Sequence, residues 1–82
     1  MPSDPALLHF NRALDFESQG RCSEAAASYR EAIRNDPMHV RALLRLGLVL
    51  RDLGRDEEAN AAFATAHGAI AAAVDAQRRL AE

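Results

Sequence analysis

The 82 residues of this chain carry a formal net charge of −2, and this slightly acidic balance argues against a general nucleic-acid-binding surface. The single cysteine, Cys22, cannot form an internal disulfide, which fits a reducing, cytoplasmic compartment. No apolar run is long enough for a signal peptide or a membrane span, so we expect no membrane association.

The first half of the chain is predicted to form two helices. Asp4 followed by Pro5 is a good start signal, because the carboxylate can cap the first turn and proline suits the first helical position. This first helix is expected to run to about Ser18. A second helix is expected from Ser23 to the residues before Asp36-Pro37, because a residue that precedes proline resists the helical conformation.

Two further helices are predicted in the second half. The third, from Met38 to Leu53, is apolar on nearly all sides, so we expect its neighbours to cover it. The fourth begins near Asp56, where acidic side chains favour a helix N-terminus. It has no strong stop signal: it either continues through Gly68 or breaks there into a separate capping helix, and we favour the break. The expected total is therefore about five helices.

Five small or aromatic positions recur at one fixed offset of 34 residues. The recurring pairs are Ala13 with Gly47, Gly20 with Gly54, Ala25 with Ala59, Tyr29 with Phe63, and Ala32 with Ala66. Small residues would let paired helices approach closely, the aromatic rings would fill the remaining gap, and the turn glycines would cap a helix. A period of this length predicts stacked helical hairpins.

The pattern resembles the tetratricopeptide repeat family, whose unit is a helix-turn-helix of about 34 residues. The match spans about residues 6 to 73. It departs at His9 and Arg12, where larger apolar residues are usual, and at Ala71, where the second unit lacks its closing proline. The resemblance implies one all-α domain over residues 1–82, a short right-handed solenoid of antiparallel helix-turn-helix repeats. Repeat one would cover residues 6–39, repeat two residues 40–73, and a C-terminal helical extension residues 69–82.

The side chains that could carry catalysis or bind metals show no productive pattern. His9, His39 and His67 are too scattered for the three or four convergent ligands of a metal site. Glu57 and Glu58 point to different sides of a helix and cannot act as a paired acid and base. There is no glycine-rich phosphate loop. We therefore expect no enzyme activity, no cofactor, no metal and no small-molecule substrate.

By the same resemblance, the first helix of each pair lines a concave groove. The implied peptide-binding residues are Leu7, Phe10, Asn11, Leu14, Met38, Arg41, Leu44, Arg45, Leu48 and Arg51. Six of these residues are apolar, which would mark an interaction site, unless the C-terminal helix fills the groove or some of them belong to the core. Asn11, Arg41 and Arg45 also match the spacing of part of a carboxylate clamp that grips acidic C-terminal peptides in some members of the family. A solvated arginine face is the simpler interpretation.

Two classes of function fit these observations. The first is a protein-protein interaction module that binds a peptide or a partner helix in the groove. The second is a structural self-assembly unit, a homodimer that uses its groove or an end face, since about three repeats are normally needed to bury every repeat surface. A monomer that binds peptides would favour the first class, and a dimer that hides the groove would favour the second.

Overall fold

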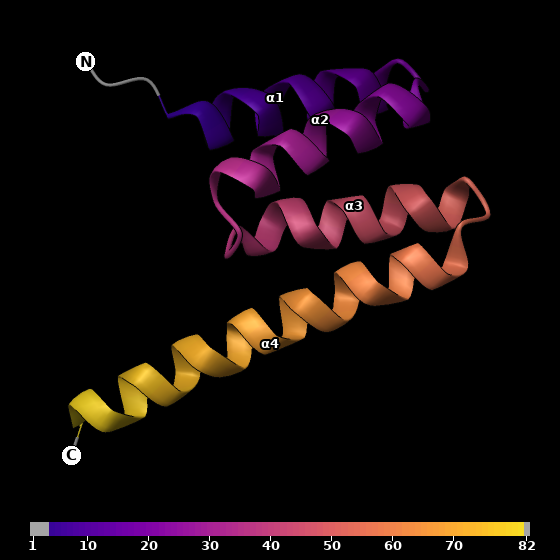
Figure 1. The fold of residues 1–82 in the computed structure, drawn as a ribbon. Coiled ribbons are helices and arrows are strands. Elements are labelled where there is room, and N and C mark those ends of the chain that lie inside the picture. The colour runs from indigo at the N-terminus through magenta and orange to yellow at the C-terminus, as the bar shows by residue number, and fades with distance from the viewer. Residues whose placement is uncertain (1–3, 82) are drawn as a thin grey trace.

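The computed structural model describes residues 4–81, which contain four α-helices and no strands. The helices are α1 (Pro5–Ser18), α2 (Cys22–Asn35), α3 (Val40–Asp52) and α4 (Asp56–Ala81). Figure 1 shows α1 and α2 as one antiparallel hairpin and α3 and α4 as a second, and α2 packs against α3. The all-helical, hairpin-on-hairpin arrangement confirms the expected fold class. Residues 1–3 and 82 of the predicted 1–82 domain lie outside the described residues.

Several helix ends form where the local signals predict them. The Asp4 carboxylate accepts hydrogen bonds from the backbone N–H groups of Ala6 and Leu7, at 3.1 and 3.3 Å. The two hairpin turns each contain a glycine with a positive φ, 73° at Gly20 and 78° at Gly54. Since side chains disfavour this left-handed region, glycine is the residue that lets the chain reverse there. The second helix stops at Asn35, before Asp36-Pro37, as predicted.

Three boundary predictions need correction. The second helix begins at Cys22 rather than Ser23. The third begins at Val40 rather than Met38, because the His39 ring caps it: its Nδ1 accepts a hydrogen bond from the Ala42 N–H at 3.2 Å. It ends at Asp52, since Leu53 forms its C-terminal cap. Of these three ends, only the start of α3 has a side-chain cap, and all three differ from the predictions by one or two residues.

The fourth helix continues through Gly68 without a break, so the expectation of five helices was wrong. It runs for 26 residues. A glycine stops a helix most readily when it adopts a positive φ, and among the described residues only Gly20 and Gly54 do so. A helical glycine costs about 1 kcal/mol relative to alanine, and the alanine-rich segments on both sides favour the helix.

Small residues and a few large rings form the core, as the repeat pattern predicts. Ala13, Ala25, Tyr29 and Ala32 are completely buried between the first two helices and α3. In the second hairpin, the ring of Phe63 occupies the space beside Gly47. A Cβ atom at position 47 would lie only 2.5 Å from Cε1 of Phe63. Close helix approach therefore depends on the small residues of the pattern.

Two glycine substitutions distinguish the effect of helix propensity on stability from the effect of side-chain packing. Gly68→Ala is expected to raise the free energy of unfolding by up to about 1 kcal/mol, because no atom lies within 4 Å of the added methyl. Gly47→Ala gains the same propensity but must displace the Phe63 ring, at a cost of about 1–3 kcal/mol, so we expect net destabilisation. Urea denaturation of both variants tests this, and stabilisation by Gly47→Ala would refute the tight contact.

Candidate functional site

Nine of the predicted groove residues are exposed or half-buried and lie on α1, on α3 or, for Met38, in the turn before α3. Those of α1 and those of α3 each recur at helical spacing on one side of their helix, and contacts of Arg41 with Phe10 and of Arg45 with Glu17 bring the two helices together. Four of the apolar side chains among the nine are substantially exposed: Leu7 (47%), Met38 (56%), Leu44 (39%) and Leu48 (38%). We call the surface that the nine residues form the α1–α3 face, and its residues are Leu7, Asn11, Leu14, Met38, Arg41, Leu44, Arg45, Leu48 and Arg51. The helices α2 and α4 pack against α3 and bury part of it, as predicted, whereas the side of α3 that carries Leu44 and Leu48 faces solvent.

Phe10 is the predicted groove residue that the structure places elsewhere. Its side chain is 2% exposed and belongs to the core, so it has no surface to offer a peptide. The ring stacks on His39 with centroids 5.0 Å apart, and it lies 5.8 Å from the ring of Tyr29. Phe10 therefore joins α1 to α2 and to the start of α3. Sequence spacing alone could not show whether Phe10 is a core residue or a surface residue of the groove.

The arginines of the α1–α3 face differ in whether an acidic side chain of the described residues already lies beside them. The Arg41 guanidinium lies 4.9 Å above the Phe10 ring, a cation–π contact that holds the side chain beside the apolar row. Arg45 lies near Glu17 of α1, with Nη1 3.6 Å from Oε2. In the part of the chain that the structure describes, Arg41 and Arg51 form no ion pair. An anionic ligand would thus find Arg41 and Arg51 more available than Arg45.

Glu17 links three helices, a role that no sequence pattern predicted. Its Oε1 accepts a hydrogen bond of 2.5 Å from the hydroxyl of Tyr29 on α2, while its other oxygen faces Arg45 on α3. Tyr29 is completely buried. Burial first, and then the hydrogen bond to Glu17, raise the pKa of the Tyr29 phenol well above its ordinary value. The only available signal was that Glu17 is an acidic residue at the end of an otherwise amphipathic helix.

Tyr29 makes stability depend on alkaline pH. Because the folded protein holds the phenol proton more tightly than the unfolded chain does, its contribution is complete below about pH 10 and is lost as the pH rises further. We expect urea denaturation midpoints to fall progressively as the pH rises above about 10. The chain contains no lysine, so few other groups titrate in this range.

The matched variant is Tyr29→Phe, which keeps the ring and removes the titrating group. Below about pH 10 it is expected to lose about 0.5–1.5 kcal/mol with the hydrogen bond to Glu17. Its stability should then be nearly flat through the alkaline range. A wild-type protein whose midpoint does not change with pH, or a variant with an unchanged alkaline loss, would contradict the assignment.

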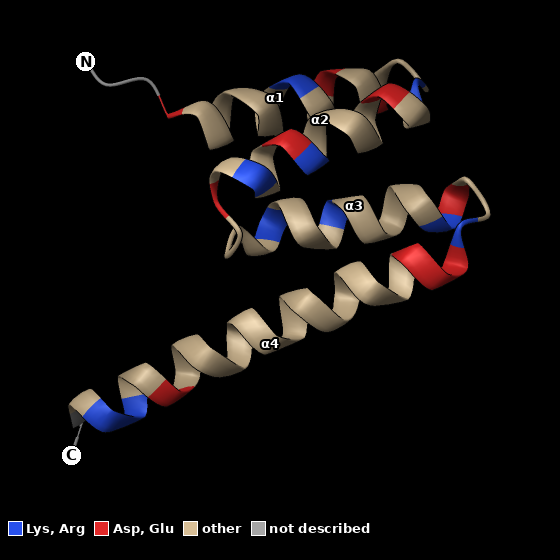
Figure 2. Ribbon diagram, in the orientation of Figure 1, with Lys and Arg blue, Asp and Glu red and all other residues tan. Residues whose placement is uncertain are grey.

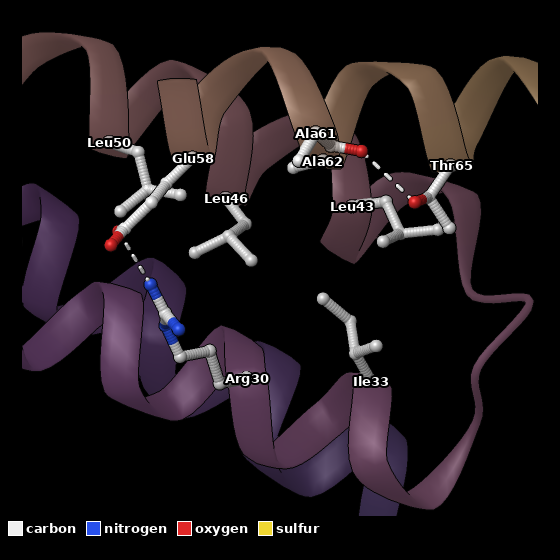
Figure 3. A pocket seen from close by; sticks show the side chains of 9 residues that line it. All are labelled: Arg30, Ile33, Leu43, Leu46, Leu50, Glu58, Ala61, Ala62 and Thr65. Atoms are coloured by element: carbon white, nitrogen blue, oxygen red, sulfur yellow. Dashed lines mark hydrogen bonds and ion pairs between the residues drawn. The ribbon is translucent and has the colours of Figure 1, made fainter. Parts of the chain in front are cut away.

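A second apolar surface lies on the other side of α3, where a cavity of about 380 Å³ opens between α2, α3 and α4 (Figure 3). We call it the α2–α4 groove, and its residues are Arg30, Ile33, Leu43, Leu46, Leu50, Glu58, Ala61, Ala62 and Thr65. Leucines of α3 form its floor. The ion pair between Arg30 and Glu58, 3.0 Å apart, closes one end.

The sequence analysis did not predict the α2–α4 groove. Its leucines have the spacing of core residues, and two of them, Leu43 and Leu50, are indeed almost fully buried. One signal was present in the sequence: Ala61, Ala62 and Thr65 leave little side-chain volume opposite those leucines. The groove exists because these small side chains do not fill the space between α2 and α4.

Comparison with known proteins agrees with this architecture. The family model described as tetratricopeptide repeat matches residues 10–82. No curated protein and no solved structure matches the chain. Within residues 4–81, no helix is both long enough and apolar enough to span a bilayer. With stacked hairpins, glycine turns and small interhelical residues in place, the chain belongs to the tetratricopeptide repeat family.

Proposed function

We propose that this chain is an interaction module that binds a peptide or a partner helix on its α1–α3 face. Tetratricopeptide repeats are generally protein-protein interaction modules. The exposure of four large apolar side chains on this one face carries the proposal: Leu7, Met38, Leu44 and Leu48. Single exposed leucines are ordinary on protein surfaces, whereas a row of them supports a binding surface.

The charges beside this row suggest the chemistry of the partner. Arg41 and Arg51 flank Leu44 and Leu48 on α3 and form no ion pair among the described residues. They suit a segment in which a large aliphatic side chain stands next to an anionic group, such as a free C-terminal carboxylate. Contacts at an open rim are weak, so the expected dissociation constant is roughly micromolar or weaker.

A peptide titration tests the proposal. Short peptides that end in a large aliphatic residue with a free carboxylate are added to labelled protein, and amide shifts locate the binding site. Leu44→Glu should abolish binding, and Arg41→Glu should weaken it. Leu8→Glu is the control, because Leu8 is also exposed, at 54%, but is not part of the face. Shifts that map elsewhere refute the proposed site, and equal binding by amidated peptides refutes the anionic anchor.

Self-assembly as a homodimer is the second candidate function. It is favoured by Ile70, Val74 and Leu80, which are exposed on the part of α4 that extends beyond α3. Neither candidate requires a catalytic step, a cofactor or a metal. We infer a cytoplasmic location from the single cysteine, which would stay a thiol in that reducing compartment.

A further inference from the structure

The fourth helix is twice as long as the helix on which it packs. It has 26 residues against 13 in α3, which corresponds to about 39 Å against about 20 Å. Figure 1 shows its far end projecting beyond the other three helices. Ala69 is its last buried residue, and every residue from Ile70 to Leu80 is exposed. Residues 70–80, here called the distal segment, are not covered by any other helix of residues 4–81.

The distal segment repeats the apolar stripe that packs on α3. The buried stripe consists of Ala59, Ala62, Ala66 and Ala69. At the same helical spacing it continues through Ile70, Ala73 and Leu80, with the polar Gln77 between the last two. Ile70 is 44% exposed and Leu80 is 87% exposed. A stripe that covers α3 in its first half is thus left uncovered in its second half.

The α2–α4 groove is the complementary feature: its floor is apolar, and no side chain of the described residues 4–81 fills it. The wall that α4 contributes consists of Glu58, Ala61, Ala62 and Thr65. Along the same flank of the helix, the distal segment carries Ala72, Ala76 and Arg79. Each half of this flank therefore consists of small residues and one charged residue at its outer end. The charged residue is the acidic Glu58 in the first half and the basic Arg79 in the second half.

We propose that the distal segment of a second copy of this chain lies over the α2–α4 groove, antiparallel to α4, and that the exchange is reciprocal. A two-fold axis near Gly68 would bring Thr65 of one copy opposite Ala72 of the second copy. Small residues then face each other along the helix pair, which permits close approach. The stripe of the distal segment would point at the leucines of the groove floor. One isologous contact would thus cover both unpartnered surfaces.

The charges of α4 fix the direction of this pairing. Figure 2 shows acidic residues at the start of α4, and arginines near its end together with one acidic residue, Asp75. Asp56, Glu57 and Glu58 occupy the first turn, and Arg78 and Arg79 occupy the last. In the antiparallel arrangement, Arg79 of each copy approaches Glu58 of the other, where Arg30 already pairs with it at 3.0 Å. A parallel pair would place like charges together, which complementary surfaces avoid.

This inference specifies the surface of the second candidate function and rests on it, whereas peptide binding on the α1–α3 face is independent of it. Sedimentation equilibrium of the full chain tests it. We expect a dimer in the micromolar range. Ala73→Glu places a charge on the stripe and should raise the dissociation constant at least about tenfold. Ala71→Glu is the matched control, because Ala71 is also an exposed alanine of the distal segment but lies on the opposite side of the helix.

The sedimentation results distinguish an error in the proposed dimer surface from an absence of self-assembly. A dimer that Ala73→Glu and Ala71→Glu weaken equally would overturn the proposed surface and leave self-assembly standing. A monomer at every concentration would overturn both. Circular dichroism shows whether each variant remains helical. Peptide titration of Ala73→Glu should match the wild type, since no residue of the α1–α3 face takes part.

Cross-linking gives a second test that does not depend on affinity. In a Cys22→Ala background, chains with Thr65→Cys are mixed with chains carrying Ala72→Cys and are then oxidised. The proposed register brings these two positions within disulfide reach, so the mixed disulfide should dominate. Ala64→Cys with Ala71→Cys is the control pair, because both positions face away from the partner. Equal cross-linking by the control pair would overturn the register.

Discussion

Replacing Phe10 with alanine is expected to lower the free energy of unfolding by about 3–5 kcal/mol. The ring is 2% exposed and contacts His39, Tyr29 and Arg41. Its loss would leave a cavity at the point where α1, α2 and α3 meet, and these helices cannot collapse into it without breaking other contacts. Small domains have only about 5–15 kcal/mol of stability, so the variant should be largely unfolded at moderate urea.

Phe16→Ala is the matched control for this prediction. Phe16 belongs to the same helix and also lies beside an arginine, with the Arg21 guanidinium 4.8 Å above its ring. Its ring is only partly buried, so truncation removes less apolar surface from the core. Urea denaturation followed by circular dichroism measures both variants. If Phe16→Ala costs as much as Phe10→Ala, Phe10 is not the junction of the three helices.

Replacing Ala59 with leucine is expected to cost about 1–3 kcal/mol or more. Ala59 is 2% exposed and lies at the start of the contact between α4 and α3. Leucine and alanine are both strong helix formers, so the loss would come from packing rather than from helix propensity. The larger side chain must push the two helices apart, and the melting temperature should fall clearly.

Ala64→Leu makes the same change on an exposed position of the same helix. We expect its effect to stay within about 0.5 kcal/mol. Thermal denaturation of the two variants shows whether the loss of stability comes from the buried contact or from the larger side chain itself. Small and equal effects would show that α3 and α4 do not depend on a close contact at Ala59, and the role assigned to the repeated small residues would fail with it.

The third helix separates the two candidate surfaces, and this arrangement has a functional consequence. Leu44 and Leu48 belong to the α1–α3 face, whereas Leu43 and Leu46 form the floor of the α2–α4 groove. The two surfaces share no side chain. A peptide on one side and a second copy on the other could therefore bind together, and loss of either surface by mutation should leave the other intact.

The sequence by itself determined the helices and the turns between them. Asp4, Gly20, Gly54 and Asp36-Pro37 mark helix ends because each restricts or caps the backbone within a few residues of itself. The repeated small and aromatic residues determined which helix faces meet. These features depend on short-range geometry and on a fixed period, and both are visible in a linear sequence.

Only the tertiary structure decided which residues are exposed. Phe10 is buried and Leu44 is exposed, although both have the spacing of groove residues, because the position of α3 beside α1 and α2 determines what covers each side chain. Gly68 is different, because its helical conformation follows from the alanine-rich segments on both sides, and that local preference was underestimated in the sequence. The α2–α4 groove, by contrast, depends on the distance between helices that are far apart in sequence. Local patterns fix the faces of single helices, and the gaps between helices follow from packing them together.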